Sequence, residues 1–242
     1  MKWWALGMVC VASVANAKPA AKASAKKSSR FSAPADAKDT PAVKHGALDA
    51  DACLAELDTR GVSYNKETAR GVVGAIRLTG PLHGVTFTPD VDKKDVDTTP
   101  YAIVDCRLAL SLDDFAALLQ KHDVVEVRHY SIYRPPPKSW PDGKEGTRHD
   151  GAMAIDAAHF IKKDGTSLDV VKHFNGAIGD ATCGPDAKPH PNTAEATELR
   201  AILCEAVDAH LFNVVLTPNY NKPHHNHFHM EVTAGVGWFL VH

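Results

Sequence analysis

The sequence has no GxSxG motif, no P-loop and no cysteine in a setting typical of a nucleophile. These absences argue against a serine hydrolase, a P-loop nucleotide hydrolase and a cysteine peptidase. The sequence also lacks a CxxC pair, the spacing that is typical of zinc sites built from thiolates. Any catalytic chemistry is therefore expected to come from other side chains.

Long apolar runs are also missing. The run from Trp3 to Val14 is too short to span a bilayer. It follows a positively charged start, Met1-Lys2, and precedes Ala15-Asn16-Ala17, a small-x-small cleavage site. We therefore expect residues 1–17 to be a cleaved signal peptide that leaves no transmembrane segment. The mature protein would be secreted, and a periplasmic location is expected.

Acidic and aromatic residues are scarce in residues 18–45, which contain seven Lys or Arg against two Asp, and one aromatic residue, Phe31. Such a segment buries too little apolar area to offset its ordering entropy, so a disordered linker is predicted. Its charge could hold the protein near an anionic cell-envelope polymer, or the linker could be only a solvated spacer. The formal net charge of the whole chain is −2, so the remainder is acidic. An acidic domain argues against nucleic acid as the main partner.

Four cysteines remain after the signal peptide: Cys53, Cys106, Cys183 and Cys204. An even number of cysteines in an exported chain favours disulfides, because the compartment is oxidising. Four cysteines permit three pairings. We favour Cys53–Cys106 and Cys183–Cys204, which join neighbours in the sequence, over a zinc-thiolate site.

Hydrophobic periodicity predicts one α+β domain over residues 46–242, with a mixed, mostly antiparallel sheet and helices packed on one side. A helix is expected to begin at Ser111, which is a good N-cap and is followed by two aspartates. The expected helices cover residues 49–60, 111–122 and 193–211. The expected strands are a hairpin within residues 71–88 and single strands at 101–104, 124–133, 152–161, 213–216 and 227–232.

Residues 224–229 read His-His-Asn-His-Phe-His. If this segment lies on a strand, the period of two places His227 and His229 on one face, and Glu231 continues that face. Two imidazoles on one face can share a metal ion, or one can bind the metal while the other transfers protons. The alternative is a loop of surface histidines, but the apolar residues that follow indicate a packed strand.

A second cluster contains His149 and Asp156. On a straight strand they would face opposite sides, so they converge only if the chain bends, for which Gly151 is well placed. Apolar residues surround Asp156, and a buried carboxylate needs either a cation or an arginine as partner. The histidines favour a divalent cation. With one histidine of the 227/229 pair, this cluster provides the three ligands of a catalytic zinc site with an open fourth position.

The spacing His-(six residues)-Asp followed much later by His-x-His resembles zinc metallopeptidases that include lysostaphin-type endopeptidases, D-Ala-D-Ala carboxypeptidases and hedgehog-type domains. The layout is more closely similar to the bacterial extensin-like C-terminal domain family, over about residues 48–233. The resemblance is carried, in order, by Cys53-Leu54, Cys106, Ser131-Ile132-Tyr133-Arg134, His149 with Asp156, and His227-Phe228-His229. It implies a hedgehog-like or D-Ala-D-Ala peptidase-like fold.

The resemblance also implies roles for individual residues. In these relatives the second histidine of His-x-His binds zinc and the first assists catalysis, which implies His229 as a ligand and His227 as a catalytic residue. His224 matches a further active-site histidine of the penicillin-insensitive murein endopeptidases. Arg134 matches an arginine near the substrate, where a guanidinium could bind a peptide carboxylate bidentately.

Two positions depart from the pattern of the relatives. Ala152 stands where a glycine is usual, so the bend after the first ligand is expected to differ. Asn226 stands where the carboxypeptidases have a glutamate as general base, and an amide cannot take a proton. Any base would therefore have to be His227 or His224.

The resemblance implies an exported peptidase with Zn²⁺ as cofactor that hydrolyses peptide bonds in peptidoglycan, in the stem peptide or its cross-links. The partner would be peptidoglycan or another cell-envelope polymer. A non-catalytic, zinc-containing module that binds cell wall or polysaccharide is the alternative, since the glutamate is missing. A metal-handling protein is a third hypothesis, because His224–Met230 would also suit copper.

Overall fold

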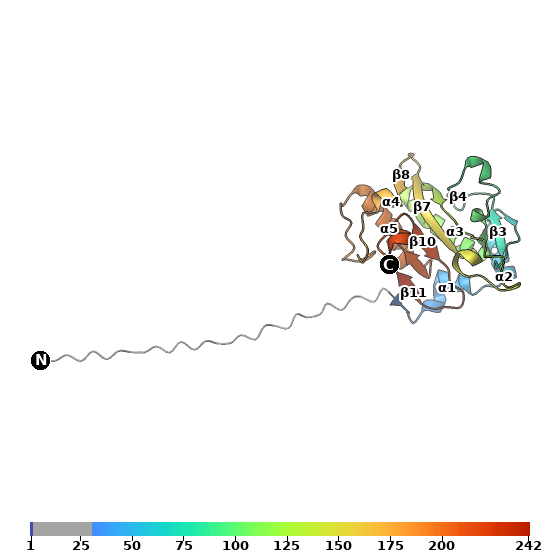
Figure 1. Ribbon diagram of the computed structural model, residues 1–242, viewed down its shortest axis with the longest axis horizontal. Helices are drawn as coiled ribbons and strands as arrows, with labels where there is room; N and C mark the ends of the chain where they lie inside the picture. The colour runs from blue at the N-terminus through green and yellow to red at the C-terminus, as the bar shows by residue number, and fades with distance from the viewer. Residues whose placement is uncertain (2–30) are drawn as a thin grey trace.

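In the described part of the chain, an eight-stranded mixed sheet forms the centre of the fold and a three-stranded sheet lies beside it (Figure 1). The structure is a computed structural model that describes Met1 and residues 31–242. The large sheet has the order β1-β11-β9-β10-β7-β6-β4, with β8 paired to β7. Its strands are β1 (Phe31–Ser32), β4 (Thr86–Pro89), β6 (Val124–His129), β7 (Ala154–Lys162), β8 (Ser167–Asp169), β9 (Val214–Leu216), β10 (Phe228–Glu231) and β11 (Phe239–Val241).

Most strand pairs of the large sheet are antiparallel; β4 with β6 and β9 with β11 are parallel. The small sheet contains β2 (Tyr64–Lys66), β3 (Ala75–Leu78) and β5 (Val104–Asp105). The α-helices are α1 (Pro41–Gly46), α2 (Ala50–Thr59), α3 (Cys106–Leu119), α4 (Val170–His173) and α5 (Ala194–Asp208). Short 3-10 turns are η1 (Ala37–Asp39), η2 (Lys93–Asp95), η3 (Pro100–Ala102), η4 (Gln120–His122), η5 (Arg148–Gly151) and η6 (Lys222–His224).

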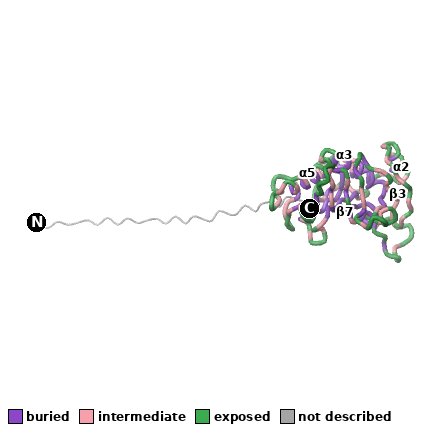
Figure 2. The backbone as a smooth tube through the Cα atoms, turned by 90° about the horizontal axis from the view of Figure 1, so that it is seen from above, coloured by how far each residue is buried: buried purple, intermediate pink, exposed green. Residues whose placement is uncertain are grey.

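The helix α3 lies at the centre of the hydrophobic core. Asp105 caps its first turn by accepting a hydrogen bond from the backbone N–H of Arg107 at 3.0 Å. Nearly all residues of α3 are buried, and Figure 2 shows buried residues concentrated along α3 and β7. Phe115 of α3 packs edge-to-face on Phe160 of β7 with ring centroids 6.4 Å apart, and Phe160 contacts Phe228 of β10. Helix and sheet therefore share one core.

The predicted fold class, one α+β domain with a mixed and mostly antiparallel sheet, is confirmed. The helices α3 and α5 contact each other and lie behind the large sheet in Figure 1. The predicted elements that correspond to observed ones are the helices over 49–60 and 193–211 (α2 and α5) and the strands over 124–133, 152–161, 213–216 and 227–232 (β6, β7, β9 and β10).

The hairpin predicted within residues 71–88 is wrong. Its two strands belong to different sheets: β3 pairs with β2 and β5, whereas β4 pairs in parallel with β6. The Gly80-Pro81 turn therefore carries the chain from one sheet to the other. The strand predicted at 101–104 is also wrong for most of its length, because η3 occupies Pro100–Ala102 and β5 begins at Val104.

The predicted start of the second helix is wrong as well. The helix α3 begins at Cys106, five residues before Ser111, because Asp105 already supplies a cap. Ser111 lies inside the helix, fully buried, with its Oγ 3.0 Å from Nδ1 of His45. A residue that is a good cap by composition is here a buried hydrogen-bonding partner.

Both predicted disulfides are confirmed, Cys53–Cys106 and Cys183–Cys204. Cys53 and Cys106 are fully buried and join α2 to the first residue of α3. Cys204 lies on α5, so the second disulfide ties that helix to the connection between α4 and α5. No zinc-thiolate site forms from these four residues.

The disordered linker predicted over residues 18–45 is contradicted from Phe31 onward. From Phe31 onward the chain packs on the domain: β1 pairs with β11, and the Phe31 ring lies 5.7 Å from that of Trp238. Ala37 and Ala42 are buried against Phe239. A few small apolar residues are enough to order this segment on the domain, because β11 has an edge with which an added strand can pair. The prediction for residues 31–45 is therefore wrong, and residues 2–30, with most of the predicted signal peptide, lie outside the described residues.

None of the helices in the described residues is long and apolar enough to cross a bilayer.

The N-cap of α5 offers a test of local helix stability. The Thr193 side chain accepts a hydrogen bond from the backbone N–H of Ala196 at 3.1 Å. Thr193→Ala should lower the free energy of unfolding by about 1 kcal/mol, a fall of roughly 2–4 °C in Tm for a domain of this size. Thr193→Ser keeps the hydroxyl and should remain close to wild type in thermal unfolding. Equal losses in both variants would contradict this role.

Candidate metal centre

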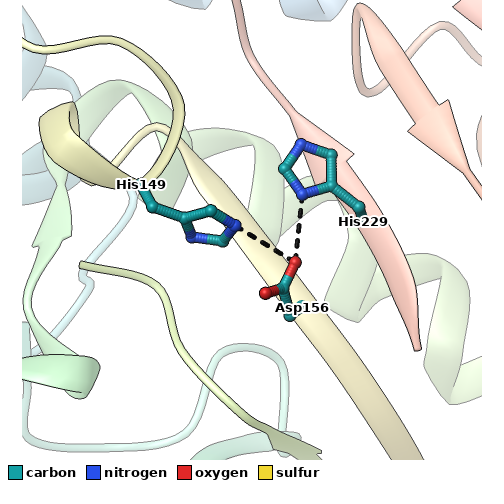
Figure 3. Close-up of side chains that lie close together, drawn as sticks. All are labelled: His149, Asp156 and His229. Atoms are coloured by element: carbon teal, nitrogen blue, oxygen red, sulfur yellow. Dashed lines mark hydrogen bonds and ion pairs between the residues drawn. The ribbon is translucent and has the colours of Figure 1, made fainter. Parts of the chain in front are cut away.

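Asp156 and His229 lie opposite each other on neighbouring strands. The antiparallel register of β7 and β10 pairs these two residues, so their side chains share one face of the sheet. The Nδ1 atom of His229 is 3.0 Å from Oδ1 of Asp156 (Figure 3). The predicted strand therefore does present His229 toward the predicted carboxylate.

His149 reaches the same carboxylate from η5, the turn that precedes β7. Its Nε2 atom is 3.1 Å from Oδ1 of Asp156, and its Nδ1 atom is 2.8 Å from the carbonyl oxygen of Ile132 (Figure 3 shows the ring). Because a carbonyl oxygen only accepts, Nδ1 carries the hydrogen, and Nε2 is the atom directed at Asp156. His149 and Asp156 thus converge although they are seven residues apart.

The bend that allows this convergence lies at Ala152, not at Gly151. Ala152 adopts the left-handed conformation with φ 54°, which is uncommon for a residue with a side chain. Gly151 is needed for another reason: a Cβ on it would lie 2.4 Å from the carbonyl oxygen of Gly146. The predicted role of Gly151 as the bend is therefore wrong, and its lack of a side chain permits a close backbone approach instead.

A register shift in β7 separates the metal-centre face from the core. Between the pairs Arg128↔His159 and His129↔Ala157, β7 contains one more residue than β6. Without the extra residue, Phe160 would share a face with Asp156, four residues earlier. With it, Phe160 packs in the core while Asp156 stays on the opposite side with His229.

The donor atoms of His149, Asp156 and His229 all lie within 4.8 Å of one another. Zinc binds nitrogen and oxygen at about 2.0–2.2 Å, so small side-chain movements would place all three on one ion. The outer nitrogen of each ring is held: His149 by the Ile132 carbonyl, and His229 by Glu231, whose Oε2 is 3.3 Å from Nε2. Carbonyl and carboxylate partners of this kind orient ligating histidines in metal sites.

The electrostatics of the cluster also favour a bound cation. Neutral His149 would direct a lone pair at a carboxylate oxygen, so either a proton or a metal ion has to lie between the two atoms. Burial alone would raise the pKa of Asp156, but hydrogen bonds from His149, His227 and His229 outweigh it and hold that pKa well below its usual range. Burial would lower the pKa of His229, but Asp156 and Glu231 raise it. The donor set therefore fits a divalent cation such as zinc.

Arg134 lies closer to Asp156 than the sequence suggested. Its Nη2 contacts Oδ2 of Asp156, and its Nε donates to Oγ of Ser131 at 2.9 Å. The arginine partner considered as an alternative to a metal is thus present, on the carboxylate oxygen that faces away from the imidazoles. The side chain of Arg134 is 53 % exposed and lines the cleft described below, so it also remains accessible to a substrate.

His227 stands at the edge of the cluster in a defined orientation. Its Nε2 is 3.3 Å from Oδ1 of Asp156, and its Nδ1 is 2.9 Å from Oδ1 of Asn226. Because an amide oxygen only accepts, Nδ1 of His227 donates to it. Asn226 cannot take a proton, but it fixes the ring so that Nε2 faces the metal centre.

His224 joins the cluster from η6. Its ring centroid lies 5.2 Å from that of His227 and 5.7 Å from that of His229. Burial, together with the neighbouring imidazoles, lowers the pKa of His224 to about 4. Its Nδ1 is 2.7 Å from Oδ1 of Asn221, which holds the ring in place. His224 is therefore neutral near pH 7.

A cleft of about 800 Å³ opens onto these side chains, within the range of roughly 300–1,000 Å³ that is typical of ligand sites. All six predicted metal, catalytic and substrate-binding residues line it. Its walls combine charged and apolar residues, which suits a substrate that has both charged and apolar groups. The lining residues that the sequence did not single out for the site include Arg148, Asp150, Tyr220, Asn221, Trp238 and Leu240.

Sequence reasoning missed two contributors to the site and one buried histidine near it. The sequence predicts the correct strand face for Glu231, but not its role as the hydrogen-bonding partner of His229. Ser131 was part of a motif, but its contact with Arg134 comes from the fold. His129 is fully buried, neither ring nitrogen has a hydrogen-bond partner among the described residues, and burial lowers its pKa to about 3. Nothing in its sequence neighbourhood distinguishes His129.

The family model described as extensin-like protein C-terminus matches residues 51–240 and so covers the whole site. No curated protein and no solved structure matches the chain significantly. The hedgehog-like or D-Ala-D-Ala peptidase-like assignment of the fold therefore stays a prediction.

Proposed function

The chain belongs to the family of extensin-like protein C-terminal domains, and we propose that it is an exported, zinc-dependent peptidase that hydrolyses peptide bonds of peptidoglycan. One observation carries the proposal: His149, Asp156 and His229 meet in the wall of a large cleft, each with its orientation held by a neighbour. On this proposal the family is related to the lysostaphin-type, D-Ala-D-Ala and hedgehog-type zinc proteins. The protein would act in the periplasm or outside the cell.

Each of the three proposed ligands would contribute a donor atom to the ion. His149 and His229 would bind it through Nε2 and Nδ1, the atoms that already face Asp156. A zinc ion held there would polarise a carbonyl and lower the pKa of a bound water to about 7. Arg134 and Ser131 would keep Oδ2 of Asp156 occupied, so that Oδ1 remains directed at the ion.

His227 and His224, which are not proposed ligands, would take part in proton transfer and hydrogen bonding during the reaction. His227 is held through Nδ1 by Asn226, which leaves Nε2 facing the centre to accept a proton and return it to the leaving amine. His224 stays neutral beside it, and because its Nδ1 hydrogen is donated to Asn221, its Nε2 can accept a hydrogen bond or a proton from a water molecule or the substrate. This assignment needs no glutamate at position 226.

The charges of the cleft suit a peptide with a free carboxylate. Arg134 and Arg148 both line it, and their side chains are mostly exposed. A guanidinium can bind a carboxylate through two parallel hydrogen bonds. Stem peptides of peptidoglycan carry such carboxylates, which makes this polymer the proposed substrate and partner.

The deciding experiment incubates zinc-loaded, full-length mature protein with purified sacculi and identifies the released muropeptides by mass spectrometry. Trimmed stem peptides or opened cross-links are expected, with none after removal of zinc by a chelator and recovery on adding zinc back. An unchanged muropeptide profile would refute the peptidase. Cleavage that persists without metal would refute the zinc mechanism.

His227→Gln separates proton transfer from metal binding. The variant should keep about one zinc per chain, because His227 is not a proposed ligand. Its rate of muropeptide release should fall by about 10²–10⁴, the typical contribution of a positioned acid or base. His225→Gln is the matched control, since His225 is exposed, lies two positions away in the sequence and does not line the cleft. Equal rates in the two variants would remove His227 from catalysis.

A non-catalytic, zinc-containing wall-binding module is the second candidate, favoured by Asn226 in the place of a glutamate. In the same experiment it predicts zinc-dependent binding to sacculi with no new muropeptides. Preference for copper over zinc in a competition titration, with rapid exchange, would favour metal handling instead.

A further inference from the structure

The floor of the metal-centre cleft changes from polar to apolar one strand away from the proposed metal ligands. The antiparallel register of β10 and β9 pairs His229 with Leu216 and Glu231 with Val214. The parallel register of β9 and β11 then pairs Val214 with Leu240. Residues paired across neighbouring strands share one face of the sheet, and such strands lie about 4.8 Å apart. Leu216 therefore lies beside a proposed zinc ligand and on the same face.

Val214, Leu216, Trp238 and Leu240 together form an apolar shelf, and all four line the cleft. Trp238 and Leu240 are partly exposed and form its accessible part. Val214 and Leu216 lie at the bottom, where they are 5 % and 8 % exposed. A ligand uses such a surface through apolar contact, which requires no directed hydrogen bond. The shelf therefore offers a place for an apolar group beside the metal centre.

The shelf lies on the opposite side of the sheet from the hydrophobic core. Val215 of β9 and Met230 of β10, which alternate with the residues of the cleft, belong to the core that β9 and β10 share with α3. Val214 and Leu216 face away from that core, toward the cleft. The core therefore does not explain why the residues of the shelf are apolar.

The strand β1 extends the apolar surface outward. Phe31 pairs with Leu240 of β11, so the two side chains share a face of the sheet. The Phe31 ring is 5.7 Å from that of Trp238, and Phe31 is 50 % exposed. Phe31 therefore borders the shelf at the end that is farther from the metal centre.

The shelf and Arg134 lie on opposite sides of the metal centre. Arg134 follows β6, which pairs with β7 on the side away from β10, and its Nη2 contacts Oδ2 of Asp156. The shelf lies on β9 and β11, beyond β10. The order across the sheet is therefore Arg134, Asp156, His229 and Leu216.

We propose that the apolar shelf binds the side chain of the substrate residue that supplies the scissile carbonyl, and that this residue is aliphatic. The inference rests on the proposed peptidase function, in which Arg134 binds a free carboxylate. When a scissile carbonyl is at the metal centre, a carboxyl-terminal carboxylate lies on the side of the leaving amine. The residue on the carbonyl side then extends the opposite way, toward Leu216. The shelf is larger than an alanine methyl group, so longer aliphatic side chains should bind better.

The test measures the cleavage of synthetic acetyl-Lys-X-Ala peptides with a free carboxyl terminus by zinc-loaded, full-length mature protein. X is glycine, alanine, valine, leucine or asparagine, each in both configurations where it is chiral. The kcat/KM for the X–Ala bond should rise about fourfold for each carbon added between glycine and leucine. Asparagine resembles leucine in size but is polar, so its peptide should be cleaved about as slowly as that of glycine. Equal rates for leucine and asparagine would refute the proposal.

Variants of the shelf test its role through a ratio that does not depend on the amount of active protein. Leu240→Thr should lower the preference for leucine over glycine about tenfold, because it removes apolar contact and adds a hydroxyl group. Trp238→Gln should act in the same direction and replaces that test if Leu240→Thr fails to fold. Val241→Thr is the matched control, because Val241 is the next residue of β11 and faces the other side of the sheet. An unchanged preference in the shelf variants would overturn the assignment.

Binding measurements separate a failure of this inference from a failure of the proposed function. If the peptides are cleaved without a preference for aliphatic X, the peptidase stands and the assignment of the shelf is wrong. If no peptide is cleaved, the peptidase is contradicted, and isothermal titration of the same peptides decides on the shelf. The leucine peptide should then bind at least about tenfold more tightly than the glycine peptide, and Leu240→Thr should remove the difference. Equal affinities, or no binding, would overturn the shelf as well.

Discussion

Asp156→Asn should remove the metal and the activity together. Asparagine keeps the size of the side chain and an acceptor oxygen, but it removes the negative charge on which His149, His227 and His229 converge. Loss of an outer partner of a metal ligand weakens binding by roughly 10–100-fold, so loss of a charged ligand should weaken zinc binding by at least about 100-fold. The bound zinc per chain and the rate of muropeptide release should both become undetectable.

Thermal unfolding provides a readout that does not depend on activity. Zinc at 100 times its Kd should stabilise the wild type by about 2.7 kcal/mol, which raises the Tm by roughly 5–10 °C for a domain of this size. Asp156→Asn should lose this zinc-dependent rise. Asp150→Asn is the control, because Asp150 lines the same cleft but lies outside the ligand cluster. A zinc-dependent rise that survives in Asp156→Asn would place the metal elsewhere.

Removing the disulfide between Cys53 and Cys106 should have the largest effect on stability. The two residues are 53 positions apart in the sequence, so the cross-link restricts the unfolded chain by about 4 kcal/mol in the chain-entropy model. Both are 0 % exposed, so a Cys53→Ala/Cys106→Ala variant also leaves a small cavity in the core. Its Tm should fall by roughly 10 °C or more.

The second disulfide is a matched comparison within the same chain. Cys183 and Cys204 are 21 positions apart and partly exposed, so their replacement by alanine should lower stability by about 3 kcal/mol, with little added loss from packing. Urea unfolding under oxidising conditions compares the two variants. A larger loss for Cys183→Ala/Cys204→Ala than for the buried pair would contradict this order, and it would show that the unfolded-state terms do not dominate.

Local sequence patterns predict an element well when nearby residues set where that element begins and ends. The helix predicted over residues 193–211 begins where α5 begins, and there the cap Thr193 acts on an amide only three residues away. Ser111 misled as a predicted cap, because its hydroxyl is bonded to His45, a partner 66 residues away. The β3–β4 hairpin failed for a related reason: strand periodicity shows that a segment is extended but not which strand it pairs with.

By itself, the sequence determined the chemistry of the site: two imidazoles and a carboxylate in a recurring order, two disulfides, and an α+β domain. These follow from residue type and spacing, which act over short distances along the chain. The tertiary structure alone decided how the parts meet. The left-handed Ala152 and the extra residue of β7 turn His149 and Asp156 toward His229. Such features depend on pairings between segments that are far apart in sequence, and no local pattern encodes those pairings.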